Sequence, residues 1–513
     1  MSEQITDNKR IAKNTIFLYI RMLVVLIVSI YTTRVVLQTL GVVDYGIYNV
    51  VAGFVSMLNF LNASMSVGIQ RFYNFENSVK NGIPQNIIFN TAIQIQVTIS
   101  VIILVILESV GLWYINYKMI IPADRLFAAN WVFQCSIISL IIVVMQVPFT
   151  GLIISRERMS YYAYISIIDA FLKLFIVLLL PYIEHDRLIY YGFLSLIINT
   201  VDFIFYFIYC KRNFIDVWFE RSFNSKLFKR IISFTGWNML DMFAYTLKGQ
   251  GTNILLNSYF GPVVNAAKGI ANQISGALSG FSLNLVTAFR PQLIGSYAEG
   301  NNDRTKTLMF TMSNISYALL GMLSIPIILE MNYVLTIWLG NDYPAYTVPF
   351  AILVLIDMSL SSLNTPISQV MQAVGILKKY QIVRGIIVLS TFPFSWVALQ
   401  AGYNPNIIFI IAIIITIINQ VVSLTILHEY FEFSYSNYLY KVILPCILFT
   451  ALVPIAPLVI NHIMHESFLR FIMVAIFTVL SSVCVCLYVM VNKEYRTAII
   501  TKLSCLIRNG KRN

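Results

Sequence analysis

Apolar runs of about 20 residues recur from one end of the chain to the other. Each is long enough to cross a bilayer as an α-helix. Membrane-spanning strands would instead show weaker alternation over about ten residues. The pattern predicts an all-α polytopic membrane protein with about fourteen transmembrane helices, near residues 13–38, 46–70, 87–112, 127–152, 161–182, 188–210, 231–257, 264–289, 307–330, 346–372, 382–401, 406–428, 438–460 and 468–491.

Composition and charge placement support this prediction. Hydrophobic residues make up 58% of the chain and charged residues only 11%, whereas soluble proteins carry about 25% charged residues. The net charge is +12, but the basic residues collect on the side that holds both termini. The opposite loops contain only Lys118, Arg125, Arg187 and Arg470. The positive-inside rule therefore predicts that both termini are cytoplasmic. We attribute the positive net charge to membrane orientation and attraction to anionic lipids, rather than to nucleic-acid binding.

The two halves of the chain share short motifs. Gly46-Ile47-Tyr48-Asn49 matches Gly269-Ile270-Ala271-Asn272, and the two motifs differ by 223 positions. The same offset relates Gln146 to Gln369. Each half also places a glycine, Gly41 or Gly261, just before its second span. Because each half has six spans, these matches predict two repeats in the same orientation.

The predicted organisation is six spans, six spans and two further spans. We expect a V-shaped pair of six-helix bundles, as the family resemblance described below implies. The predicted segments are an N-terminal bundle over 1–210, a basic cytoplasmic linker over 211–230, a C-terminal bundle over 231–430, two accessory helices over 431–492 and a basic cytoplasmic tail over 493–513.

Several spans carry polar stripes. In the seventh span Asn238, Asp241, Tyr245, Lys248 and Thr252 follow steps of three and four residues, so they share one helix face. Comparable stripes occur in the second, eighth and tenth spans. Such stripes either mediate polar packing between helices or line a hydrated cavity between the halves. The presence of four stripes favours the cavity. Gly249 and Gly251 are expected to loosen the seventh span, and prolines 148, 326, 366, 445 and 454 permit kinks.

Charged residues inside spans usually face a bundle interior or a watery cavity. Asp169 and Lys173 lie four residues apart, which predicts a structural ion pair on one helix face. The intramembrane charges lean cationic, which favours an anionic substrate. Asp241 and Asp357 are the candidates for binding a coupling ion, Na⁺ or H⁺.

Sequence signals for catalysis and for metal binding are weak. The chain has no Walker lysine motif, no glycine-rich dinucleotide loop and no HExxH motif. His462 and His465 share a loop without a third ligand, so no metal site is expected. Short loops leave no room for a soluble catalytic domain. We therefore expect neither an enzyme nor an ATP-driven pump, and no cofactor.

The motifs in order resemble those of bacterial polysaccharide transporters. They are Arg34-Val35-Val36-Leu37, Leu40-Gly41 and Asp44-Tyr45-Gly46-Ile47-Tyr48 near the N-terminus, and Arg290-Pro291-Gln292, Ser296-Tyr297-Ala298-Glu299-Gly300, Trp338-Leu339-Gly340 and Gln372-Ala373 in the second half. The likeness covers about residues 10–430 and is greatest to the O-antigen and capsule flippases of the multidrug/oligosaccharidyl-lipid/polysaccharide exporter superfamily.

This resemblance implies alternating access and translocation of an undecaprenyl-diphosphate-linked oligosaccharide, such as a lipopolysaccharide O-antigen unit, across the bacterial inner membrane. It places Arg34, Arg71 and Arg290 at the diphosphate, where we add Lys248 from the polar stripe. Asn49, Asn272 and Gln369 would meet sugar hydroxyls. The implied partners are the lipid-linked oligosaccharide, membrane lipids and a polysaccharide polymerase or other assembly protein.

Two alternatives belong to other functional classes. A cation-coupled multidrug exporter of the same fold would depend on Asp241 or Asp357. A membrane-embedded glycosyltransferase or polymerase would need a large external loop with catalytic groups, which the chain lacks.

Overall fold

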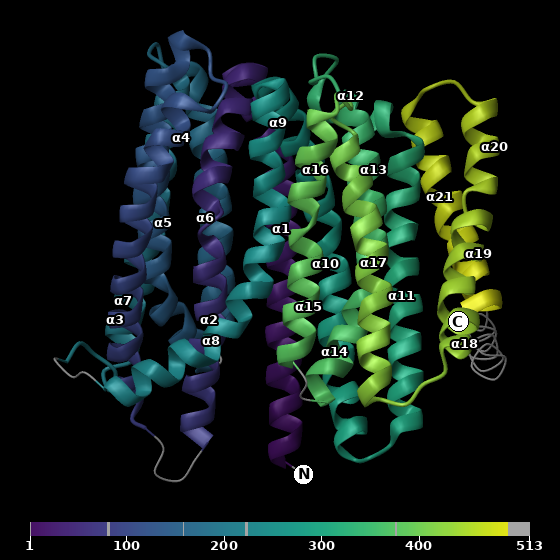
Figure 1. Ribbon diagram of the computed structural model, residues 1–513, viewed down its shortest axis with the longest axis horizontal. Coiled ribbons are helices and arrows are strands. Elements are labelled where there is room, and N and C mark those ends of the chain that lie inside the picture. The colour runs from purple at the N-terminus through teal and green to yellow at the C-terminus, as the bar shows by residue number, and fades with distance from the viewer. Residues whose placement is uncertain (1, 79–82, 157, 221–223, 375–376, 491–513) are drawn as a thin grey trace, which may run out of the picture. The chain divides into compact units, whose positions relative to one another are not determined.

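The computed structural model describes residues 2–78, 83–156, 158–220, 224–374 and 377–490 (Figure 1). The described residues are almost entirely helical and contain no strand. Eleven of their helical segments are long and apolar enough to cross a membrane. Of the three other predicted spans, 46–70 covers the end of α1 (Ser2–Ser56) and the start of α2 (Asn59–Ser78), so its predicted boundaries are wrong. The spans 231–257 and 264–289 lie in α8 with α9 (Ser225–Thr246 and Thr252–Phe260) and in α10 (Pro262–Ala298). The predicted polytopic α-helical fold is confirmed.

The chain forms two compact units, each described here separately. Unit 1 contains residues up to 270, 342–347 and 381–408, and unit 2 contains 271–341, 348–380 and the chain from 409 onward. Besides α2, α8, α9 and the start of α10, the main helices of unit 1 are α1 (Ser2–Ser56), α3 (Gln85–Ile106), α4 (Leu112–Tyr117), α5 (Leu126–Ser155), α6 (Met159–Leu179), α7 (Arg187–Asn213), α15 (Leu377–Leu389) and α16 (Thr391–Gln400).

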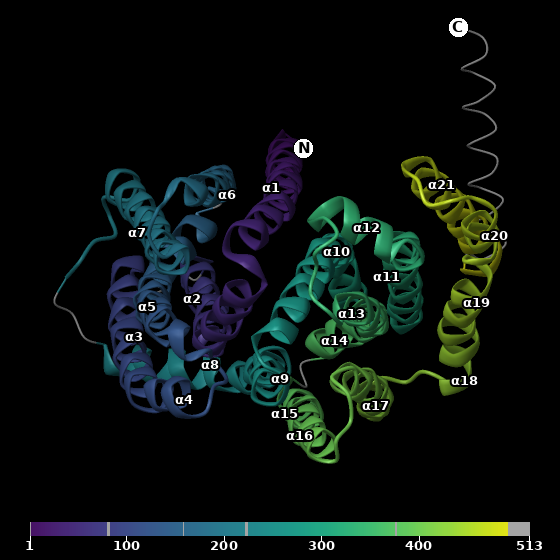
Figure 2. The same cartoon turned by 90° about the horizontal axis from the view of Figure 1, so that it is seen from above.

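Helix α5 is at the centre of the N-terminal helices of unit 1. It packs against α1, α2, α3, α6 and α7, and Figure 2 shows α3, α7 and α2 around it. Its Phe133 and Phe149 are almost completely buried in one continuous apolar core. A helix that is apolar on all sides can occupy such a position because it needs no polar face toward water.

The glycines that precede the second span of each half adopt the same backbone conformation. Gly41 has φ 80° and ψ 169°, and Gly261 has φ 78° and ψ −174°. This region is almost closed to residues with a side chain. Gly41 therefore divides the continuous α1 at a kink, and Gly261 ends α9 one residue before α10 begins. The predicted correspondence between the two halves extends to their backbone geometry at these sites.

The second segment of α1 packs unusually close to α9 and α10. A Cβ atom on Gly46 would lie 2.0 Å from the carbonyl oxygen of Pro262, and one on Gly269 would lie 2.8 Å from Oδ1 of Asn49. Glycine permits this approach because it has no side chain, as is common where membrane helices meet. Asn49 of the first copy of the repeat motif thus contacts Gly269 of the second, and both residues belong to unit 1.

We predict that Gly46→Ala lowers the thermal stability of the purified protein by several degrees, because the new methyl group would displace the Pro262 backbone. Gly249→Ala is the matched control, since its added Cβ would meet no atom within 4 Å. Melting temperatures of both variants check this. Equal melting of the Gly46 variant and the wild type would contradict the close contact.

A cluster of three charged residues joins three helices at one end of unit 1. Arg125 precedes α5, and its Nε lies 2.8 Å from Oδ1 of Asp44 in α1 while its Nη1 lies 2.6 Å from Oδ2 of Asp186 at the start of α7. Burial alone would raise the pKa of the Asp186 carboxyl, but the hydrogen bonds and positive charge of Arg125 lower that pKa below its ordinary value. Asp186 also caps α7 by accepting from the backbone N–H of Leu188.

We predict that Arg125→Met destabilises the protein by about 2 kcal/mol, less than for a fully buried pair because a fifth of the side chain is exposed. The loss arises because two carboxylates would remain together without their cation. Adding Asp44→Asn to this variant should restore part of the stability, and Arg187→Ala, at a more exposed arginine, serves as control. Thermal melting measures all four proteins. No recovery in the double variant would contradict the charge argument.

The segment after α7 is part of the packed bundle. The backbone N–H of Trp218 donates to Oδ1 of Asn86 at 2.8 Å, and Nδ2 of Asn90 donates to the Trp218 carbonyl at 2.9 Å. Phe219 makes ring contacts with Phe89 and Phe149 of the core. Residues 214–220 therefore lie against the end of the α3, α5 and α7 cluster, so this part of the predicted basic linker is anchored to the helices.

Unit 2 contains the rest of α10 together with α11 (Asn302–Leu329), α12 (Met331–Leu339), α13 (Thr347–Ser361), α14 (Asn364–Val374), α17 (Ile407–Tyr430), α18 (Tyr435–Tyr438), α19 (Leu444–Leu452), α20 (Ile455–Ile463) and α21 (Phe468–Val485). Helix α11 holds the last four helices to the rest of this unit. Glu330, which is almost fully buried at the end of α11, accepts from Arg470 of α21 at 2.6 Å and from Asn461 of α20 at 2.9 Å.

The prolines act in two different ways. Pro148 and Pro326 lie inside continuous helices. Pro366 instead lies in the first turn of α14, after a break from α13, and Pro454 lies at the break between α19 and α20. Pro445 follows a π-helical turn over Leu439–Ile443. A proline removes one backbone donor. The helix nevertheless continues through Pro148 and Pro326, and it is interrupted next to Pro366 and Pro454.

Candidate functional site

The polar stripe of the seventh span is interrupted by a π-helical turn. Residues Leu247–Gly251 form this turn between α8 and α9, where the two glycines were expected to loosen the span. The wider turn shifts the helical register, so Lys248 and Thr252 no longer continue the face of Tyr245 in regular steps. Thr252 is buried and its hydroxyl donates to the Lys248 carbonyl at 2.9 Å.

Lys268 of α10 forms hydrogen bonds to residues in and next to this π-helical turn. It is only 3% exposed. Its Nζ donates to the Gly249 carbonyl at 2.6 Å and to the Thr252 hydroxyl. No carboxylate pairs with it among the residues that the structure describes. A cation in such surroundings is costly unless its donors are used, and here they satisfy backbone and hydroxyl oxygens next to the turn.

Helix α15 adds a third cation to this region. Nε of Arg384 donates to the Tyr245 hydroxyl at 2.9 Å, and a second guanidinium nitrogen donates to the same oxygen. The guanidinium carbon lies 4.8 Å from the centre of the Tyr245 ring. Lys268 and Arg384 thus contact residues 245–252 from α10 and α15, and Lys248 lies within the same stretch, all in unit 1.

Sequence analysis did not identify Arg384 as a site residue. It grouped this arginine with the basic residues on the side that holds both termini. The contact joins residues 139 positions apart, and no local pattern reports such a pairing. The only sequence feature that could have indicated Arg384 was its position as a basic residue just inside the predicted eleventh span, 382–401.

The structure describes only some of the residues predicted to bind the diphosphate. Arg34 lies in α1 before the Gly41 kink and is partly buried, and Lys248 lies in the π-helical turn. The side chains of Arg71, Asp241 and Arg290 lie outside the described part of the structure. Arg34 and Lys248 both belong to unit 1.

The three residues predicted to meet sugar hydroxyls differ in exposure. Asn272 is exposed on α10. Asn49 packs beside Gly269, and its Nδ2 donates to the Tyr45 carbonyl at 2.8 Å. Gln369 is 8% exposed, and its Oε1 accepts no hydrogen bond within the described structure. Of the three, only Asn272 is presented to a ligand without rearrangement.

The structure gives hydrogen-bonding partners for the predicted ion pair, Asp169 and Lys173, and for one predicted ion-coupling residue, Asp357. Lys173 Nζ lies 2.8 Å from Oδ2 of Asp169, as expected from their spacing. Asp202 of α7 lies within hydrogen-bonding range of Asp169. In unit 2 the Thr416 hydroxyl of α17 donates to Oδ1 of Asp357 in α13.

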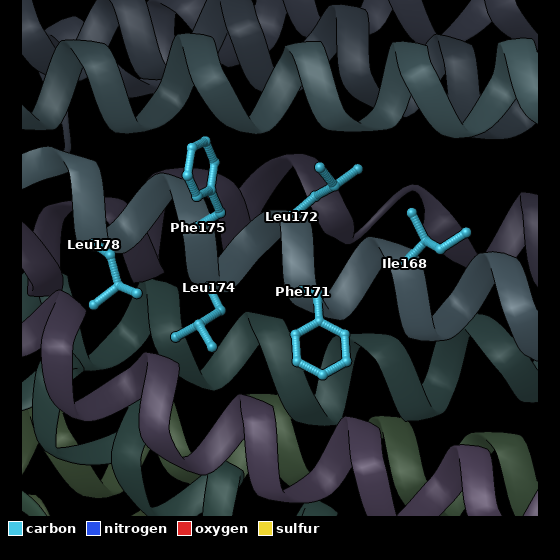
Figure 3. A pocket seen from close by; sticks show the side chains of 6 residues that line it. All are labelled: Ile168, Phe171, Leu172, Leu174, Phe175 and Leu178. Carbon is cyan, nitrogen blue, oxygen red and sulfur yellow. The ribbon is translucent and has the colours of Figure 1, made fainter.

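Two hollows differ in chemistry. The first, about 470 Å³, is lined only by apolar residues of α6, which project from the helix in Figure 3: Ile168, Phe171, Leu172, Leu174, Phe175 and Leu178. It offers nothing to a sugar or a phosphate. The second, about 950 Å³, lies in unit 2 between α11 and the C-terminal helices. Its lining includes Lys306 and Lys441 as well as Leu319, Met322 and Leu487, which suits an amphiphile.

Among the residues that the structure describes, no group of three histidine, cysteine or carboxylate side chains is placed to hold a metal ion.

No family model and no curated protein matches the chain. Solved structures match it well in three dimensions. The lipid II flippase MurJ in an inward closed conformation aligns with a TM-score of 0.65 and 12% identity, over 92% of this chain and 98% of MurJ.

A multidrug resistance MATE family transporter of the MOP superfamily, in an inward-facing conformation, aligns with a TM-score of 0.63 and 11% identity, over 79% of this chain and 95% of the transporter. A MOP superfamily transporter from Pyrococcus furiosus aligns with a TM-score of 0.53 and 13% identity, over 82% and 96%. The chain has the fold of the MOP superfamily transporters.

Proposed function

We propose that this protein is a flippase that moves an undecaprenyl-diphosphate-linked oligosaccharide across the bacterial plasma membrane by alternating access, without ATP. The observation that carries the proposal is the presence of three cations along one stretch of unit 1: Lys268 and Arg384 donate to groups within residues 245–252, and Lys248 lies in this stretch. Cations held at membrane depth favour an anionic cargo, and a diphosphate presents several acceptor oxygens to them. Arg34, Arg71 and Arg290 complete the proposed set.

The fold and a groove within unit 2 support a lipid-linked cargo. The fold is shared with MurJ over nearly its whole length. The groove in unit 2 changes from polar residues in the first turns of α11 to apolar residues further along the helix. A ligand with a polar head and a hydrocarbon chain matches such a lining. Asn49, Asn272 and Gln369 remain the proposed contacts of the sugar hydroxyls.

The proposed orientation has both termini in the cytoplasm, and the proposed organisation has segments 1–210, 211–230, 231–430, 431–492 and 493–513. Both proposals rest on the excess of basic residues on one side and on the repeat. The specific O-antigen or capsule unit and a polymerase partner belong to the same proposal.

Complementation tests the function. The chain is expressed in bacteria that lack their own polysaccharide flippase, and surface glycan is compared with lipid-linked precursor. Restored surface glycan supports the proposal. Accumulated precursor with several different glycans, despite good membrane insertion, contradicts it.

We predict that Arg34→Ala reduces surface glycan at least tenfold in this assay, because one charge-assisted contact to the diphosphate is lost. Lys379→Gln is the control, since this lysine pairs with Glu429 on the surface of the protein. Membrane levels of both variants are measured by immunoblot. Full activity of a correctly inserted Arg34 variant would remove Arg34 from the site.

A cation-coupled multidrug exporter is the second candidate, because MATE transporters share the fold. Asp241 and Asp357 would bind its coupling Na⁺ or H⁺. Increased drug tolerance of overexpressing cells that is lost in Asp357→Asn would favour this candidate, and unchanged tolerance would oppose it.

A further inference from the structure

Two carboxyl groups meet inside unit 1, in the middle of two membrane-spanning helices. Asp169 of α6 and Asp202 of α7 lie within hydrogen-bonding range of each other. Asp202 is 9% exposed. Oδ1 of each side chain is buried and accepts no hydrogen bond from a described residue. Each acid therefore keeps one buried oxygen for which the described structure supplies no donor.

This contact has a simple chemical requirement. An ionised carboxylate only accepts hydrogen bonds, so two ionised carboxylates cannot bond to each other. Two carboxylates that share a site keep one proton between them, because both charges together are too costly, and at membrane depth the cost is greater. With one proton, one carboxyl group becomes a donor and the other accepts from it. A single proton thus removes the repulsion and supplies the missing donor.

The nearest cation balances only one of the two acids. Nζ of Lys173 lies 2.8 Å from Oδ2 of Asp169. Asp202 forms no ion pair with a described residue, and the charge of Lys173 acts on it without a hydrogen bond. One ionised and one protonated acid therefore match the single lysine that contacts the pair.

The other groups around the pair are tyrosines and one arginine. Tyr206, one turn after Asp202, is 3% exposed and interacts with both acids and with Arg21 of α1. The guanidinium carbon of Arg21 lies 4.9 Å from the centre of the Tyr162 ring. Helix α5 packs against both α6 and α7 and contains no charged residue. None of these groups forms an ion pair with Asp202 within the described structure, so its negative charge would lack a direct partner.

We propose that Asp169 and Asp202 form a proton-binding site in unit 1, in which the two carboxyl groups share one proton and Lys173 balances the remaining negative charge. Binding forms an O–H bond at one carboxyl group and a hydrogen bond to the other. Release leaves two carboxylates beside one lysine and removes a link between α6 and α7. The site is separate from Asp241 and Asp357, and it does not depend on the identity of the cargo.

Infrared spectroscopy of the purified full-length protein in lipid tests the site, because a protonated carboxyl group has a C=O band that a carboxylate lacks. At about pH 6 carboxyl groups in water are ionised, yet the wild type should retain a protonated carboxyl band that disappears at alkaline pH. Asp202→Asn should abolish this band. Its amide can donate to Asp169 in place of the proton, so the melting temperature should stay close to that of the wild type.

Two further variants complete the experiment. Asp303→Asn is the control, since the Asp303 side chain is 96% exposed and pairs only with Lys306, and its band should equal that of the wild type. Lys173→Gln should retain the band to higher pH, because the positive charge that favours ionisation is lost. Lys173 is half-exposed, so this variant also decides the question if Asp202→Asn does not fold.

Two outcomes would overturn the site and leave the proposed function standing. One is a spectrum at about pH 6 in which no protonated carboxyl band depends on Asp202. The other is a band that vanishes when Na⁺ replaces K⁺ at constant pH, because a metal cation would then occupy the pair in place of the proton.

Discussion

A membrane interior contains no water to solvate charge, so every charged side chain placed there needs a partner from the protein. This constraint explains where the described charges lie. Arg125 binds Asp44 and Asp186 together, and Glu330 binds Arg470. Each set joins helices that are distant in sequence. The ion pairs therefore hold helices together at their ends. The Arg125 set keeps about a fifth of its exposure, which lowers the cost of desolvation, whereas Glu330 and Arg470 are buried and rely on each other.

The cations near the π-helical turn are held differently. Lys268 binds a backbone carbonyl and a hydroxyl, and Arg384 binds a tyrosine hydroxyl. Neutral acceptors satisfy the donors of Lys268 but do not cancel its charge. Close helix packing fixes the backbone around it: a Cβ atom on Gly251 would lie 2.9 Å from Phe392 of α16. The proposed recognition of an anionic cargo rests on such a preorganised positive charge.

Sequence periodicity predicted the helical spans and the Asp169–Lys173 pair, because these features depend on neighbours within a few turns. The repeat marked the positions of Gly41 and Gly261 but not their backbone conformation. Arg125 with Asp44 and Asp186, and Arg384 with Tyr245, could not be predicted in this way, since their partners lie 81, 61 and 139 positions away. The π-helical turn also escaped prediction, because a regular 3.6-residue period was assumed through Gly249 and Gly251. Asn49 shows a further limit: its polarity gave no indication that it packs beside Gly269.

The most direct test of the account is transport by the purified full-length protein in liposomes. A fluorescent undecaprenyl-diphosphate-linked oligosaccharide is placed in both leaflets, and its accessibility to a membrane-impermeant quencher is followed over time. The account predicts exchange between leaflets that is faster than in protein-free liposomes, is unaffected by ATP and is strongly slowed in Arg34→Ala. Equal exchange rates with and without protein, across several oligosaccharides and with an imposed Na⁺ or H⁺ gradient, would contradict it.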